Sequence, residues 1–344
     1  MSKITVVGMD LAKNVFQVHG VDDDGHVLCR KQLRRGQVLS FFARLEPCLV
    51  GMEACGGMHY WARKLSELGH TVRPMAARFI KPYLKSNKSD ALDAEAICEA
   101  VQRPNMRFVS PKSPDQQAVL HLHHSRRLLV GQRTALINHV RGVLLEFGIA
   151  VPVGPNVLRR RLPEILEDGD NELPLLTREL IAALADQLRA LDERINGLEQ
   201  QIKVWHRNNE ASQRLAKVPG IGMMTATALV AAAGNGRAFR TGREFAAWLG
   251  LVPRQDSSGG RQRLLGISKR GDRYLRALLI HGARAVIRHL RARLAAGRPA
   301  GNPWLAKLIE RRHPNVAAVA LANRNARVVW ALMARQESYR PMAG

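Results

Sequence analysis

The first hundred residues contain strands and helices in an order that few folds accommodate. Apolar segments predict five strands, at 3–10, 13–20, 26–32, 48–53 and 70–76. Helices are expected over 58–68 and 89–102, with Ser89 or Asn87 as the N-cap of the second. Three strands in a meander, followed by alternating helix and strand, predict a mixed α/β sheet.

Four carboxylates occur in this pattern where their side chains can meet. Asp10 and Glu53 each end a predicted strand, and side chains at neighbouring strand ends can share one crevice. Asp90 and Asp93, spaced i and i+3, lie on one face of the second helix. Mg²⁺ prefers hard oxygen ligands and assists displacement at phosphorus. Each acid alone fits an ordinary surface residue, so the predicted Mg²⁺ site depends on their combination.

The charge balance of the chain predicts a nucleic-acid partner. There are 53 Lys+Arg against 29 Asp+Glu, a formal net charge of +24. Between Arg254 and Arg293 the sequence has eleven Lys+Arg against two acids, Asp256 and Asp272. Phosphate-directed, salt-sensitive binding is therefore expected.

Composition also limits the compartment and the class of protein. A hydrophobic content of 46% argues against global disorder. The four cysteines form no CxxC pair, which favours reduced thiols in a cytoplasmic protein. The start of the chain, MSKITVVGMD, is expected to be a strand rather than a signal peptide. No apolar stretch approaches the ~18–20 residues that a membrane span needs.

Two long helices are predicted after residue 110, over 115–147 and 175–207, separated by a proline-containing stretch. Apolar residues of the second helix recur at alternating spacings of four and three, at Leu184, Leu188, Leu191, Ile195, Leu198, Ile202 and Trp205. This spacing predicts a coiled-coil seam, buried by pairing of the two helices or of two copies of one. The expected domains are 1–110, a helical connector over 111–210, and a mainly helical domain over 211–344.

The order of the acids, with "GMDLAK" on the first strand and "KSDALDA" on the helix, resembles the RuvC-like ribonuclease-H fold. The later segments "VPGIG", "WLGLVPRQDSSGG" and "GISKRGDRYLRALLI" resemble the C-terminal domain of DEDD insertion-sequence transposases, bacterial recombinases guided by a bridge RNA. The resemblance covers nearly the whole chain and is weakest at about 150–210.

The resemblance implies that a serine in the loop Ser257-Ser258-Gly259-Gly260 attacks DNA and becomes joined to phosphate. Ser258, directly before the glycines, is the expected nucleophile, and Ser257 is the second choice; without the resemblance this is an ordinary flexible turn. The implied cofactor is Mg²⁺. The implied partners are double-stranded donor and target DNA and a structured guide RNA. A tetramer built from dimers would let the carboxylates of one subunit meet the serine of another.

Further residues are candidates for nucleic-acid contacts. Gly220 and Gly222 occur in Pro-Gly-Ile-Gly, which is similar to a helix-hairpin-helix turn, although an ordinary helix–helix turn is the alternative. The expected basic contacts near the serine are Arg254, Lys269, Arg270, Arg273 and Arg276. A helix is predicted over about 272–293, where Arg284 and Arg288 add basic positions, for which a solvated face is the alternative. The spacing of His121, His123 and His124 argues against zinc.

Three functions follow from these features. The first is an RNA-guided DNA recombinase with a serine nucleophile and a Mg²⁺-carboxylate centre. The second is a Holliday-junction resolvase, in which metal-activated water attacks, although a simple resolvase lacks the serine-containing C-terminal domain. The third is a non-catalytic nucleic-acid scaffold, which would tolerate loss of all four acids.

Overall fold

The computed structural model describes residues 3–85 and 89–340, so Asn87 lies outside the described residues. The chain forms two compact units, 1–113 and 114–344. The second unit contains both the predicted connector and the predicted C-terminal domain. No helix in the described part of the chain is long and apolar enough to cross a membrane.

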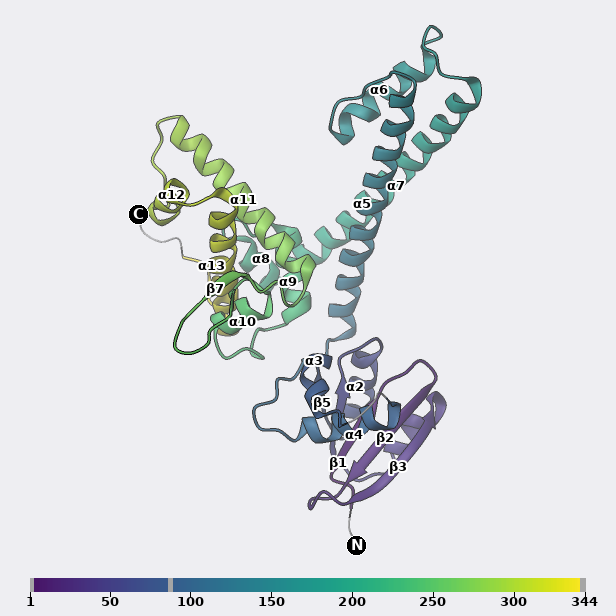
Figure 1. Ribbon diagram of the computed structural model, residues 1–344, viewed down its shortest axis with the longest axis vertical. Coiled ribbons are helices and arrows are strands. Elements are labelled where there is room, and N and C mark those ends of the chain that lie inside the picture. The colour runs from purple at the N-terminus through teal and green to yellow at the C-terminus, as the bar shows by residue number, and fades with distance from the viewer. Residues whose placement is uncertain (1–2, 86–88, 341–344) are drawn as a thin grey trace. The chain divides into compact units, whose positions relative to one another are not determined.

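A five-stranded sheet forms the centre of the first unit, with the strand order β3-β2-β1-β4-β5 (Figure 1). Its strands are β1 (Val6–Asp10), β2 (Val15–Val21), β3 (Val27–Arg34), β4 (Leu49–Glu53) and β5 (Thr71–Met75). The first three strands are antiparallel, whereas β4 pairs parallel with both β1 and β5. The five predicted strands are confirmed, and this mixed sheet is consistent with the RuvC-like fold that the resemblance implies.

Helices cover both faces of this sheet because strand residues alternate between the two faces. On one face, Val7 and Met52 pack in a core with α1 (Val38–Phe42) and α2 (Met58–Glu67). On the other face, α4 (Asp90–Val101) crosses the strands at two glycines. A Cβ on Gly8 would lie 2.1 Å from the carbonyl oxygen of Ala94, and one on Gly51 would lie 2.8 Å from Val101. The glycines therefore let α4 approach β1 and β4 closely. The short helix α3 (Ala77–Ile80) precedes α4.

Two long helices, α5 (Pro114–Glu146) and α7 (Leu175–Arg207), pack against each other in the second unit (Figure 1). Their predicted bounds are confirmed to within one residue. Leu188, Leu191, Ile195 and Ile202 of the predicted seam are buried. Of the two pairings that the spacing allows, the structure has the two helices of one chain together, while supercoiling and association between chains stay predictions.

The sequence analysis missed the helix α6 (Pro155–Glu167) between them. Prolines in this segment suggested an interruption, but Pro155 is in the first helical turn, where proline is tolerated. Leu158, Leu162 and Ile165 of α6 are buried in one core with residues of α5 and α7. Tertiary packing therefore stabilises a helix whose composition argues against it.

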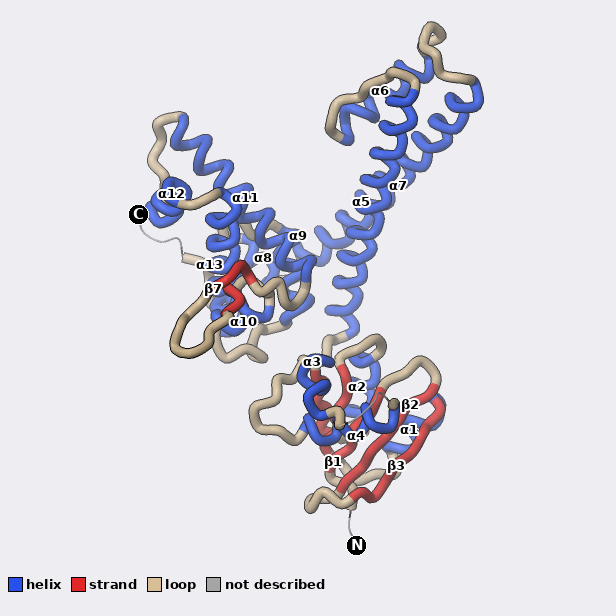
Figure 2. Tube along the Cα trace, viewed as in Figure 1, coloured by secondary structure: helices blue, strands red, loops and turns tan. Residues whose placement is uncertain are grey.

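Six further helices and a two-stranded ribbon complete the second unit (Figure 2). The helices are α8 (Glu210–Ala216), α9 (Met223–Ala233), α10 (Gly242–Trp248), α11 (Arg273–Ala295), α12 (Pro303–Arg311) and α13 (Pro314–Arg335). The ribbon consists of β6 (Pro253–Gln255) and β7 (Leu264–Ile267), paired antiparallel. The sequence predicts a loop at 257–260 but not the strands on either side of it, because strands of three and four residues are too short to show alternation.

Candidate active site

The ends of two neighbouring strands supply the first two carboxylates. β1 and β4 are parallel, and Met9 is paired with Met52, so the next residues, Asp10 and Glu53, leave the sheet side by side. Both follow the alternation of Gly8 and Gly51, which places them on the face covered by α4. The local fold thus directs both acids toward one helix.

The first turn of α4 supplies the other two. Its N-cap, Ser89, is extended, and the carbonyl of Ser89 accepts a 2.9 Å hydrogen bond from the amide of Asp93. Asp90 and Asp93 therefore both begin the helix where it lies against β1. Carboxylate oxygens of Asp10, Asp90 and Asp93 lie within 4.8 Å of one another. Glu53 is outside this three-residue cluster, but its charge acts on Asp10.

Electrostatics in this cluster are unfavourable in the metal-free protein. Burial raises the pKa of Asp10 to about 6, with further contributions from the negative charges of Asp93, Asp90 and Glu53. Among the described residues, none of these four acids forms an ion pair within 4 Å. Asp10, Glu53 and Asp93 are partly buried, whereas Asp90 is exposed. Carboxylates that repel one another and present only hard oxygen donors have the chemistry of a divalent-cation site.

A second group of possible ligands, at the β2–β3 turn, has a local structural explanation. One oxygen of Asp22 accepts hydrogen bonds from the amides of Asp24 and His26, at 3.1 and 2.8 Å. Gly25 has a φ of 84°, as a tight turn of this kind requires. The group Asp22, Asp24 and His26 is therefore explained as a hairpin tip.

The candidate nucleophile lies on the exposed loop that joins β6 and β7. The two serines differ in their hydrogen bonds. The Ser257 hydroxyl accepts from the Gln255 side chain at 3.0 Å and from the Arg263 amide at 3.3 Å. The Ser258 side chain is exposed and makes no hydrogen bond within the described chain. Gly259 and Gly260 have φ values of 54° and 76°, so the turn after Ser258 uses backbone conformations that favour glycine.

The ribbon lies over an apolar hollow of about 940 Å³. Leu251, Pro253, Leu265 and Ile267 line one side of it, while Trp304 and Val316 line the other. The guanidinium of Arg324 lies over the Trp304 ring, 4.6 Å from its centroid. The serine loop therefore extends from a short ribbon instead of packing on the helical core.

The predicted basic contacts near the serine fall into two groups. Arg254, Lys269, Arg270 and Arg273 are exposed. Arg276 is 9% exposed, and one of its terminal nitrogens donates to the carbonyls of Leu249 and Arg270, both at 3.1 Å. Its guanidinium is engaged in holding the segment before α11 in place, so it does not present the side chain that the sequence analysis expected.

The Pro-Gly-Ile-Gly turn is packed on one side. Gly220 has a φ of 87°, and a Cβ on Gly282 of α11 would lie 1.8 Å from the Gly220 carbonyl. The Asn325 side chain donates to the Pro219 carbonyl at 2.8 Å. Gly222 is exposed and precedes α9 as its N-cap. The turn packs against α11 and α13, and within it Pro219 and Gly222 are exposed while Ile221 is buried.

One polar residue that the sequence analysis did not assign joins the long helix to the C-terminal helices. His123 on α5 is fully buried, and its two ring nitrogens lie 2.9 Å from the hydroxyls of Tyr274 and Thr227. Burial lowers its pKa to about 4, with smaller contributions from Arg126 and His124. Its sequence context, a run of three histidines, gives no signal of this role.

Comparison with known proteins assigns the family. Residues 7–149, which contain all four carboxylates, match a DEDD transposase family, and residues 212–297, which contain the serine loop, match "Transposase IS116/IS110/IS902 family". A probable family 20 transposase of Pseudomonas aeruginosa is 56% identical over 97% of this chain and 98% of its own length. The chain belongs to the IS116/IS110/IS902 family of transposases.

Other members of this transposase family match along almost their whole length. The transposase for insertion sequence element IS1328 of Yersinia enterocolitica is 43% identical over 96% of this chain and 97% of its own length. The transposase for insertion sequence element IS1111A of Coxiella burnetii is 43% identical over 99% of this chain and 92% of its own length. Membership in the transposase family therefore covers both units of the structure.

Proposed function

We propose that this transposase cuts and rejoins DNA strands through a covalent bond to Ser258, using a Mg²⁺-dependent carboxylate centre. The observation that carries the proposal is the convergence of Asp10, Asp90 and Asp93 on one sheet edge, with the pKa of Asp10 raised to about 6. A cluster whose charges repel one another is stabilised by a divalent cation, which would polarise a phosphate when bound.

The residues have distinct roles in this mechanism. Asp10, Asp90 and Asp93 would hold the cation, and Glu53 would add negative charge beside Asp10. The Ser258 oxygen forms a bond to phosphorus while the bond from phosphorus to a deoxyribose oxygen breaks, and the leaving oxygen gains the proton that the hydroxyl loses. Rejoining reverses this exchange with a different deoxyribose hydroxyl. The free hydroxyl of Ser258 supports it over Ser257, whose oxygen already accepts two hydrogen bonds.

The carboxylates and the serine belong to different units of the chain. We propose that they meet in an assembly of two or four copies, with the carboxylates of one subunit beside the serine of another. Sequence selection by a structured guide RNA, which the family resemblance implies, suits a chain rich in phosphate-binding side chains and lacking an obvious base-reading motif. A junction resolvase is the alternative, in which water replaces the serine as nucleophile.

The test is a recombination assay with donor and target DNA, the RNA that flanks the element, Mg²⁺ and purified protein. Wild-type protein should give a denaturant-resistant protein–DNA adduct. Ser258→Ala should abolish it, while Ser257→Ala, a matched change on the neighbouring residue, should retain it. Junction cleavage by Ser258→Ala at the wild-type rate would favour the resolvase, and insertion without RNA would overturn guidance by RNA.

A further inference from the structure

α11 carries a second group of arginines, farther along the helix than those beside the serine ribbon. Arg284, Arg288 and Arg291 are exposed and spaced i, i+4 and i+7, so they follow one face of the helix. Together with Ile287, Pro314 and Asn315 they line a cleft of about 250 Å³ between α11 and the start of α13. We term this the arginine cleft.

The arginines of the cleft have no acidic partner. Among the described residues none of the three forms an ion pair, and Arg284 donates a hydrogen bond of 3.0 Å to the Asn315 side chain. From residue 257 to the end the sequence contains three acids. Asp272 accepts hydrogen bonds at the start of α11, and Glu337 pairs with Arg335 at 3.9 Å. Glu310 is the one remaining acid after residue 257, a region that contains many more arginines than acids.

Other arginines of α11 show what an engaged guanidinium looks like here. Arg276 donates to two backbone carbonyls, and Arg293 donates to the carbonyl of Pro299 at 3.0 Å. These contacts fix the two ends of the helix to the loops beside them. Arg288 and Arg291 make no such contact in the described chain, so packing does not account for them.

We infer that the arginine cleft binds the phosphodiester backbone of a nucleic acid that this transposase handles, at a place distinct from the serine loop. This rests on the proposed function, since it adds a second contact to the same substrate complex. Guanidinium groups bind phosphate oxygens through paired, charge-assisted hydrogen bonds. No base-reading role is assigned to it, so the cleft positions the strand and does not select its sequence.

The dimensions of α11 suit a backbone contact. At 1.5 Å per residue, Arg284 and Arg291 are about 10 Å apart along the axis, which is long enough to face about three phosphates of one strand. The cleft starts about 16 Å along the helix from Arg273, beside the serine ribbon. A strand held at both places would have its direction and register fixed relative to Ser258.

The test compares nucleic-acid binding by Arg284→Gln/Arg288→Gln/Arg291→Gln with the wild type as salt is varied. The probes are a short DNA duplex of the element's end and a single-stranded transcript of its flanking RNA. Loss of three phosphate contacts should lower the slope of log K against log salt by about 2.7 for the duplex or about 2.1 for the single strand. The probe whose slope changes identifies which nucleic acid occupies the cleft.

A matched variant separates this cleft from total charge. Arg194→Gln/Lys203→Gln/Arg207→Gln removes three exposed charges from α7 and should leave both slopes within about 0.5 of the wild type. Equal losses for the two triple variants, or unchanged slopes for the cleft variant, would overturn the inference. Ser258→Ala should keep the wild-type slopes. If Ser258→Ala lost the adduct while the cleft variant also kept the wild-type slopes, the cleft inference alone would be refuted. If Ser258→Ala still formed the denaturant-resistant adduct while the cleft variant had the reduced slope, the serine proposal alone would be refuted.

Discussion

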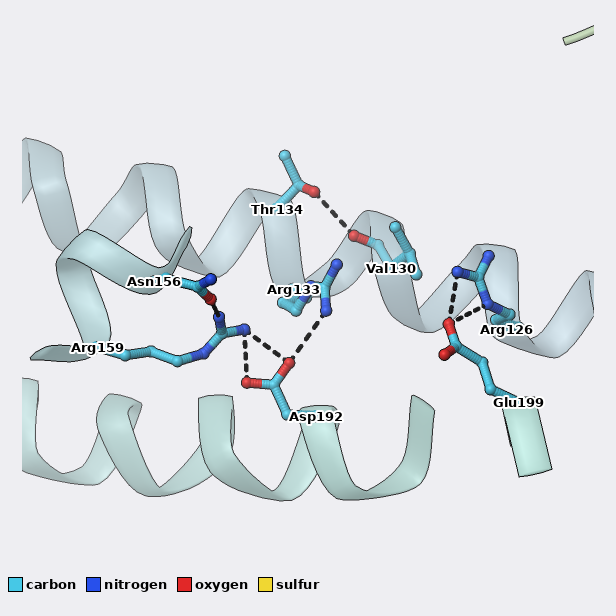
Figure 3. Close-up of polar contacts among 8 residues, drawn as sticks. All are labelled: Arg126, Val130, Arg133, Thr134, Asn156, Arg159, Asp192 and Glu199. Carbon is cyan, nitrogen blue, oxygen red and sulfur yellow. Dashed lines mark hydrogen bonds and ion pairs between the residues drawn. The ribbon is translucent and has the colours of Figure 1, made fainter. Parts of the chain in front are cut away.

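The long helical pair and the candidate sites treat charge in opposite ways. Between α5, α6 and α7, arginines are neutralised inside the chain: Arg126 pairs with Glu199 at 2.6 Å, while Arg133 and Arg159 both pair with Asp192 (Figure 3). In the carboxylate cluster and the arginine cleft, by contrast, like charges gather without an internal partner. The charges of the helical pair form ion pairs that stabilise the fold, whereas the charges of the two sites require a cation or a phosphate to neutralise them.

The difference teaches how to read a chain with a net charge of +24. The excess of basic residues alone does not distinguish a structural helical pair from a binding surface, because both contain arginines at helical spacings. What distinguishes them is whether a partly buried acid faces each arginine. Removing a paired charge should therefore destabilise the fold, and removing an unpaired one should reduce function while leaving stability unchanged or higher.

Asp10→Asn should give the largest effect. Strand cleavage is expected to fall at least about 10³-fold, because a cation ligand is lost. The same change should stabilise the metal-free protein by about 1–2 kcal/mol at neutral pH, after allowance for solvent screening. The raised pKa of Asp10 means that the contribution of this one carboxyl to wild-type stability is full below about pH 4 and is lost as the pH rises through about 6.

Urea unfolding in EDTA at about pH 4 and about pH 7.5 checks the sign of this prediction. The stability of the wild type relative to Asp10→Asn should fall between the two pH values, since the contribution of His123 changes equally in both proteins. Asp23→Asn, on the β2–β3 turn, is the control for loss of one negative charge and should follow the wild type. A destabilised Asp10→Asn at neutral pH would show that the cluster is neutralised internally after all.

His123 provides the next largest effect, at the place where the helical pair joins the C-terminal helices. Its pKa is lowered to about 4, so folding favours the neutral ring. The contribution of His123 to stability should be full above about pH 6.5 and fall as the pH drops toward 4, by about 3 kcal/mol in total and about 2 kcal/mol at pH 5. His123→Gln should remove this part of the pH dependence, as measured by urea unfolding.

His124→Gln is the matched control, since the neighbouring side chain is exposed. It should retain the wild-type loss of stability on acidification. If His123→Gln lost stability between pH 6.5 and 4 as steeply as the wild type, the buried ring would not be the group that takes up the proton.

Asp192→Ala should destabilise the helical pair by about 1–2 kcal/mol, because it leaves Arg133 and Arg159 unpaired at partly buried positions. Asp186→Ala on the same helix is the control. Asp186 pairs with Arg189 while both side chains are 72% exposed, so its loss should change stability by less than about 0.5 kcal/mol. Equal effects in chemical unfolding would contradict the distinction between architectural and exposed pairs.

Most of the fold is predictable from local sequence, for identifiable reasons. The strands of the first unit alternate or form continuous apolar runs, and the apolar residues of α7 recur at helical spacing from Leu184 to Trp205. The convergence of Asp10 with Asp90 and Asp93 follows from strand ends and the first turn of a helix. The sequence does not show the role of Gly8, whose missing side chain lets α4 lie close to β1.

The remaining features depend on packing between distant segments. Prolines obscured α6, whose helical state depends on burial against α5 and α7. Arg276 and Arg273 look alike in sequence, but only the fold shows that Arg276 is buried against the carbonyls of Leu249 and Arg270. The burial of His123 between Tyr274 and Thr227 likewise joins residues more than one hundred positions apart.

Arg288→Gln should have the smallest effect on stability, less than about 0.5 kcal/mol, because the side chain is exposed and has no ion pair in the described chain. Arg276→Gln on the same helix provides the contrast. Its loss leaves the buried carbonyl of Leu249 and the partly buried carbonyl of Arg270 without this donor, and should destabilise the protein by about 2–3 kcal/mol. Thermal and urea unfolding of the two variants compare an arginine that holds the fold with one left for a phosphate. If Arg288→Gln were as destabilising as Arg276→Gln, the arginine cleft would be part of the architecture, and the contrast with the helical pair would no longer hold.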